Sequence, residues 1–258
     1  MQIDEKLLAV RKKLGLSKAQ MADGVIDPSY YSRVERGESN ISATDLIGLL
    51  QKHNVSVIDF LSEFGDIQPK IEVYQRQALK AFNNKDLEKL EEIKNDPQLN
   101  YVILKKIVEG MLDYLTTGKK VEISSDLKSY LSNVDHWLDY DLWNLWVCLQ
   151  VYLPTYLQSL AEMAVAQFLK HDYEKESYIS LELAANIAIT NLKLAYSSGE
   201  DGLVRKMIDL LDKFPAVNST YFPKMVGKYY EAAYNQDKLM KAKIEDALEM
   251  MKGLKGLK

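Results

Sequence analysis

Apolar residues recur at helical spacing along nearly all of this 258-residue chain, and this periodicity restricts the fold more than any other feature. From Ile71 onward the apolar positions repeat every three to four residues, with no convincing strand pattern and no glycine-rich phosphate loop. At 47% hydrophobic and 27% charged residues, the chain can build real cores. The sequence therefore predicts an all-α globular protein.

Capping and turn residues divide residues 1–65 into five short helices. A Ser, Thr or Asp before a helix accepts hydrogen bonds from its first N–H groups, Pro fits the first helical position, and Gly ends a helix in the left-handed conformation. The third helix is expected from Pro28 to about Arg36. The residues that start or stop the five helices are Gly15, Ser17, Asp27 with Pro28, Gly37, Ser42 or Thr44, and Ser56.

The region from 71 to 258 carries a weak repeat of helical hairpins. An aromatic residue near the end of one helix is followed by a polar turn and a second amphipathic helix. This suits a tetratricopeptide-like stack, although the small-residue signature of that repeat is absent and an irregular helical bundle stays open. We therefore expect a domain at 1–65, a linker at 66–70 and a helical-repeat domain at 71–258. The repeated aromatic positions are Phe82, Tyr114, Tyr152, Tyr196 and Tyr234.

Residues 142–161 contain no charge, and twenty such residues are long enough to span a bilayer. Polar residues and Pro154 interrupt the run, so a buried helix pair hinged at Pro154 is the preferred interpretation and a membrane span the alternative.

The N-terminus has no signal-peptide pattern. The single cysteine, Cys148, fits a small core residue in a reducing compartment, and we expect the protein in the cytoplasm.

The charge distribution limits how the chain could bind nucleic acid. The net charge is −4, and residues 1–65 hold 8 Lys and Arg against 9 Asp and Glu. Cations nevertheless cluster between Arg11 and Arg36. Any recognition of nucleic acid must therefore be local.

Two short helices joined by a tight turn, the second rich in Ser, Tyr and Arg, form the helix-turn-helix arrangement, whose second helix enters the major groove of DNA. The segment RKKLGLSKAQMADGVIDPSYYSRVERG, residues 11–37, resembles the Cro/cI-type repressor domain. Together with ERGESNIS and LLQKHNVSVIDF, which follow it, the segment is most similar to the Rgg family of peptide-responsive regulators. The similarity is close over residues 7–64, and Lys18 stands where the wider group often has Gln.

The resemblance and the helical pattern divide the residues of the third helix into two faces. Arg11 and Glu35 match a pair that forms a structural ion pair in such domains, and Tyr31 and Val34 fall on the apolar side. On the other face Arg33 could bond bidentately to guanine, with a phosphate contact or plain solvation as alternatives. Tyr30 could meet a thymine methyl or a phosphate beside Ser29, while Lys18, Ser32 and Arg36 are expected to contact phosphates.

A single domain of this kind reads about half a site, so we expect a homodimer on a palindromic promoter site, with its interface in the C-terminal helices. The resemblance implies that residues 71–258 bind a short hydrophobic signalling peptide and alter transcription, as in quorum sensing. Asn or Gln side chains could clamp the peptide backbone. No arginine lies between Arg76 and Arg205, so a peptide carboxylate in that region would meet lysine or no cation. The expected peptide-binding residues are Asn144, Asn186, Thr190 and Lys193.

Each of these asparagines could instead be satisfied by neighbouring backbone. Asn144 lies on one helical stripe with Asp141 and Cys148, and Asn186 lies on another with Thr190 and Lys193.

The sequence offers no support for an enzyme, a metal site or a cofactor. His53, His136 and His171 are widely separated, and Asp139 and Asp141 are two apart on a helix, so they do not face each other. The leading hypothesis is therefore a peptide-controlled, DNA-binding transcriptional regulator. The alternative is a helical-repeat adaptor whose N-terminal module serves only protein contacts.

Overall fold

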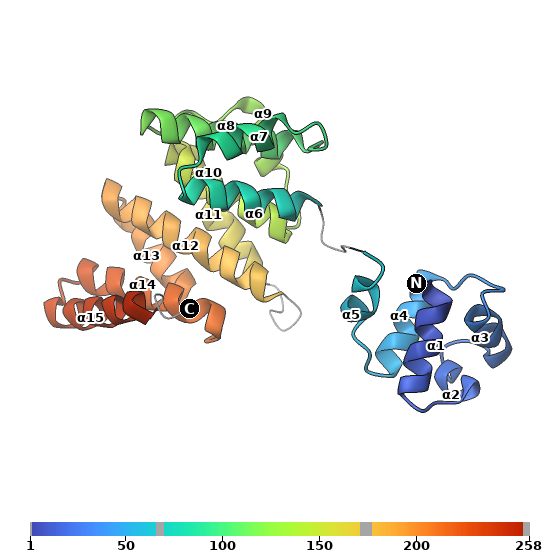
Figure 1. Ribbon diagram of the computed structural model, residues 1–258. Helices are drawn as coiled ribbons and strands as arrows, with labels where there is room; N and C mark the ends of the chain where they lie inside the picture. Colours follow the sequence, from blue (N-terminus) through green and yellow to red (C-terminus); the bar gives the residue numbers. More distant parts are fainter. Residues whose placement is uncertain (1, 66–69, 171–176, 255–258) are drawn as a thin grey trace. The chain divides into compact units, whose positions relative to one another are not determined.

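Apart from one isolated bridge between Val121 and Tyr152, all regular secondary structure is helical in the residues that the computed structural model describes, which are 2–65, 70–170 and 177–254 (Figure 1). This confirms the all-α prediction. The chain divides into one unit of residues 1–69 and another of residues 70–258. The predicted linker, 66–70, lies outside the described residues except for Lys70, which begins α6.

The first unit contains five helices, and their ends follow the capping residues of the sequence. The Asp27 carboxylate accepts hydrogen bonds from the backbone N–H groups of Ser29 and Tyr30 at 2.9 and 3.1 Å. Ser42, rather than Thr44, caps the fourth helix. The third helix ends one residue earlier than predicted. The helices are α1 (Ile3–Lys13), α2 (Lys18–Ala22), α3 (Pro28–Glu35), α4 (Ala43–Lys52) and α5 (Val57–Ser62).

One hydrophobic core holds these five helices together. Tyr31 and Val34 turn the inner face of α3 into it, and Met21 and Ala22 do the same for α2, as predicted. Because these residues are buried, the opposite face of α3 points away from the core. The core residues are Leu7, Met21, Ala22, Tyr31, Val34, Leu46, Leu49, Leu50 and Phe60.

A bidentate ion pair ties α1 to α3. Arg11 donates from Nε and Nη2 to the Glu35 carboxylate at 2.6 and 2.8 Å, and from Nη1 to the Leu16 carbonyl at 2.8 Å. The two side chains are 14% and 3% exposed. The hydrogen bond from Arg11 lowers the pKa of Glu35 against the opposing effect of burial. The predicted structural role of this pair is confirmed.

The second unit is built from successive helix pairs, as the hairpin repeat predicted. Each repeated aromatic residue lies at or near the C-terminal end of the first helix of a pair, and the rings of Phe82 and Tyr114 are 6.0 Å apart. The pairs are α6 (Lys70–Asn83) with α7 (Leu87–Asn95), α8 (Val102–Thr117) with α9 (Ser125–Ser132), α10 (Asp139–Val151) with α11 (Pro154–Phe168), α12 (Tyr178–Ser198) with α13 (Asp201–Lys213), and α14 (Asn218–Tyr234) with α15 (Lys238–Leu254).

Helix α12 lies at the centre of this unit and packs against α10, α11, α13 and α14 (Figure 1). The uncharged stretch 142–161 forms α10 after its acidic first turn, and the first half of α11, which begins at Pro154. Its interior-facing residues are buried in the unit's core, Cys148 among them. The burial of α10 and α11 in this core confirms the predicted buried helix pair. No helix in the described ranges is long and apolar enough to span a membrane.

Candidate nucleic-acid interface and ligand-binding face

The outer face of α3 carries an arginine with an open guanidinium. Within residues 2–65 the exposed Arg33 side chain has no hydrogen-bond or ion-pair partner, and its Cζ lies 6.0 Å from the centre of the Tyr30 ring. The Tyr30 hydroxyl donates to the Asn40 carbonyl at 2.7 Å, and the Ser29 hydroxyl donates to Asp27. Arg33 is therefore the side chain of this face best able to form new bidentate hydrogen bonds.

The predicted phosphate contacts form a hydrogen-bonded chain along the same face. Lys18 of α2 donates to Ser32 Oγ at 3.2 Å, and Arg36 donates to the same oxygen at 2.8 Å. Lys18 also lies 3.6 Å from the Glu35 carboxylate. The structure thus brings Lys18, Ser32 and Arg36 together beside Arg33, with Glu38 bound to the far side of Arg36.

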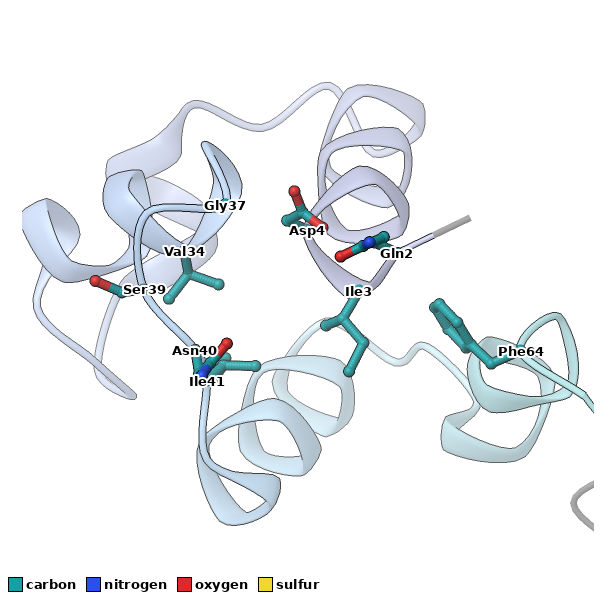
Figure 2. A pocket seen from close by; sticks show the side chains of 9 residues that line it. All are labelled: Gln2, Ile3, Asp4, Val34, Gly37, Ser39, Asn40, Ile41 and Phe64. Carbon is teal, nitrogen blue, oxygen red and sulfur yellow. The ribbon is translucent and has the colours of Figure 1, made fainter.

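A hollow of about 570 Å³ lies elsewhere on the first unit (Figure 2). The start of α1, with Gln2, Ile3 and Asp4, lies between Phe64 and the loop that follows α3. No lysine or arginine lines it, and Asp4 brings a negative charge. This hollow is consequently unsuited to a phosphate and separate in chemistry from the α3 face.

In the second unit, Asn186, Thr190 and Lys193 lie on one face of α12. Asn186 and Thr190 are half-buried and Lys193 is exposed. The Thr190 hydroxyl donates to the Asn186 carbonyl at 2.7 Å, inside its own helix. The Asn186 amide and the Lys193 ammonium remain without a hydrogen-bond partner among the described residues. These two groups can receive a ligand without breaking an existing contact.

Asn144 has different surroundings, because α10 turns it into the interior. It is 1% exposed, accepts from Gln75 Nε2 at 2.9 Å and donates to the Tyr130 hydroxyl at 3.2 Å. Tyr130 donates in turn to Asp141, and Gln75 also donates to the Tyr140 carbonyl at 3.1 Å. Peptide binding by Asn144 stays a prediction, and it would require the amide to exchange one of these partners for the peptide.

The histidines and acids that a catalytic site would need are dispersed. His53 Nε2 lies 2.9 Å from the Met21 carbonyl, His136 is exposed, and His171 lies outside the described residues. Asp139 accepts from Ser177 and Ser180, whereas Asp141 accepts from Tyr130 and the Leu138 N–H. In the part of the chain that the structure describes, no three His, Cys, Asp or Glu residues gather as a metal site would need.

Several contributors to these sites were missed by sequence reasoning. Glu38 and Asn40 follow Gly37 within the ERGESNIS segment, so their position in a recognised motif was a usable signal. Gln75 and Tyr130 reach Asn144 from α6 and α9, 69 and 14 residues away. No local sequence pattern predicts contacts such as those of Gln75 and Tyr130 with Asn144.

Comparison with known proteins finds matches to both the N-terminal helical domain and the fold of the whole chain. A helix-turn-helix family model matches residues 7–60. No curated protein sequence matches the chain. The SHP pheromone receptor Rgg2 of Streptococcus dysgalactiae is similar in structure with a TM-score of 0.77 and 21% identity, over 99% of this chain and 94% of that one.

Two further structures are similar over the same length. For a putative transcriptional regulator of Listeria monocytogenes EGD-e the TM-score is 0.71 and the identity 15%, covering 98% of this chain and 91% of that one. For Bacillus thuringiensis PlcR, solved with the peptide PapR7 and DNA, the TM-score is 0.50 and the identity 15%, covering 99% of this chain and 98% of that one. The chain therefore carries a helix-turn-helix domain within residues 7–60 and shares its fold, over nearly its whole length, with Rgg2.

Proposed function

We propose that this protein is a sequence-specific DNA-binding transcriptional regulator whose activity is controlled by a short signalling peptide. Residues 1–65 would bind DNA, and residues 71–258 would bind the peptide and form a homodimer. The shared fold supports this division of labour, because Rgg2 is a pheromone receptor and PlcR was solved with both a peptide and DNA.

The observation that carries the DNA-binding proposal is the open guanidinium of Arg33 on the outer face of α3. Tyr31, Val34 and Glu35 are buried on the inner face of this helix and fix its orientation in the domain. The outer face therefore stays accessible to the major groove. In this proposal Arg33 bonds bidentately to a guanine, with Ser29 and the Tyr30 ring beside it. Lys18, Ser32 and Arg36 contact phosphates, and a dimer places two such helices on a palindromic site.

Arg33→Ala is expected to weaken binding to the promoter site at least about tenfold, because each protomer of the dimer loses a bidentate base contact that contributes roughly 1–3 kcal/mol. The measurement is a fluorescence-anisotropy titration of the full chain against labelled DNA from immediately upstream of its own gene and its neighbours. Lys80→Ala, which removes an exposed cation of α6, away from the C-terminal helices expected to form the dimer, is the control. Wild-type protein that binds none of this DNA, with or without culture supernatant, would favour the adaptor.

For the peptide we propose the α12 face, where Asn186 would clamp the peptide backbone and Lys193 would meet a carboxylate. Thr190 lies between them, and Asn144 would join after exchanging a partner in its buried network. Support comes from the open hydrogen-bonding groups of Asn186 and Lys193.

If this face binds the signal, the low-molecular-mass fraction of culture supernatant should shift the DNA affinity of the wild-type protein roughly fivefold or more, in one direction. Asn186→Ala and Lys193→Ala should each reduce that shift while leaving the affinity without supernatant unchanged. Asn84→Ala and Lys80→Ala remove the same side-chain types at and after the end of α6 and should retain the full response. A response equal in all four variants would rule out this face.

A further inference from the structure

An exposed carboxylate neutralises one of the cations on the α3 face. Arg36 donates from Nε to Glu38 Oε1 at 2.6 Å and from Nη2 to Oε2 at 2.7 Å, a bidentate pair. The two side chains are 50% and 51% exposed. Arg36 also donates from Nη1 to Ser32, so every nitrogen of its guanidinium already has an acceptor.

The turn after α3 fixes where Glu38 stands. Gly37 has a φ of +72°, which a glycine adopts without strain, and a Cβ there would lie 2.9 Å from the Asp4 carboxylate. The backbone N–H groups of Gly37 and Glu38 donate to the carbonyls of Val34 and Arg33, each at 2.9 Å. The backbone of Glu38 is thus anchored to the helix that holds Arg33, and its side chain folds back onto Arg36.

Glu38 acts on more than one cation. Its pKa is lowered by the hydrogen bond from Arg36 first, and also by the charges of Arg33 and Lys18. It is therefore ionised at neutral pH. Glu38 thus cancels the charge of Arg36 at short range. By contrast, the carboxylate near Lys18, that of Glu35, is already neutralised by Arg11.

We propose that Glu38 limits the affinity of the α3 face for DNA phosphate by competing with phosphate for Arg36, and so makes binding depend on base contacts. The inference rests on the DNA-binding function proposed above. A phosphate that approaches Arg36 must displace the carboxylate or lie beside it, and two anions repel each other at that distance. An exposed ion pair is cheap to break, so a site with good base contacts can replace it, whereas non-specific DNA gains little from doing so.

The test uses a labelled duplex of random sequence, because phosphate contacts are independent of sequence. Full-length wild type and Glu38→Gln are titrated by fluorescence anisotropy at several salt concentrations. Glu38→Gln should bind this duplex roughly threefold or more tightly at low salt. The slope of log K against log salt should steepen by about 0.9 for each protomer that gains a phosphate contact, and so by about 1.8 for the dimer.

Two further proteins complete the design. Glu63→Gln removes the same charge from a glutamate side chain of similar exposure, 49%, which pairs with Lys6 elsewhere in the unit, and it should leave the slope unchanged. The double variant that carries both Arg36→Ala and Glu38→Gln should show neither the tighter binding nor the steeper salt slope of Glu38→Gln alone. Equal or weaker binding by Glu38→Gln, while the wild type still binds, would overturn this inference alone. No binding by any of these proteins would overturn the DNA-binding function and this inference with it.

Discussion

Replacing Glu35 with alanine is expected to destabilise the packing of α1 against α3 by about 3–5 kcal/mol. The change leaves the guanidinium of Arg11, 14% exposed, with only the Leu16 carbonyl as a hydrogen-bond acceptor. Breaking a buried ion pair is costly because the remaining charge is desolvated without compensation. Hydrogen exchange of the backbone amides of α1 and α3 in the full chain measures the loss as a lower free energy of opening.

The exposed pair of Asp23 with Lys52 supplies the control, and Asp23→Ala should cost less than about 1 kcal/mol. If both variants lost the same protection, the Arg11–Glu35 pair would have no special structural role.

The same pair gives the first unit a pH dependence with a definite sign. The pKa of Glu35 is lower in the folded state than in the unfolded chain, chiefly because Arg11 donates to the carboxylate. Its contribution to stability is therefore complete above the ordinary pKa of a glutamate and is lost as the pH falls through the lowered folded value. Glu35→Gln should weaken this acid-dependent loss of protection in α1 and α3.

Gly110→Ala in α8 is expected to destabilise the second unit by about 2 kcal/mol, although alanine favours a helix by up to about 1 kcal/mol over glycine. A Cβ at position 110 would lie 2.5 Å from Cζ and 3.0 Å from Cε1 of Tyr152. That ring is buried, and its hydroxyl donates to the Lys106 carbonyl at 2.8 Å, so it cannot yield without losing this hydrogen bond. Denaturation followed by tryptophan fluorescence measures the effect, since all three tryptophans lie in this unit.

Gly202→Ala in α13 is the matched control, because no atom outside its own stretch of helix lies within 4 Å of the Cβ it would add. This substitution should leave stability unchanged or raise it slightly. Equal stabilisation by both substitutions would show that α8 and the Tyr152 ring separate at little cost.

Features that depend on local interactions were predictable from the sequence. Asp27, Ser42 and Ser56 cap the helices they precede because an oxygen acceptor close to free N–H groups needs no distant partner. The helical period placed Tyr31 and Val34 inside the first unit for the same reason. A spaced motif likewise identified the helix-turn-helix and the pairing of Arg11 with Glu35.

Asn144 illustrates what the sequence left undecided. Its stripe with Asp141 and Cys148 has the spacing of a ligand-binding face, but α10 is buried on nearly all sides, and all three residues lie inside. A helical period shows which residues share a face and does not show what covers that face. The partners of Asn144 come from α6 and α9, and only the packing of those helices brings them there.

The sequence by itself determined the helical class of this protein, the ends of its N-terminal helices and the exposure of Ser29, Arg33 and Arg36 on α3 and at its end, because these depend on neighbours within one or two helical turns. Tyr30, expected on the same face, is half-buried and packs against the core.

Only the tertiary structure decided that Asn144 is enclosed, that Asn186 and Lys193 are open, and that Glu38 occupies Arg36. Burial and side-chain pairing depend on which segments contact each other in the folded chain. These contacts are made by residues far apart in the sequence, or they depend on the backbone conformation of a turn, and neither can be read from a local pattern.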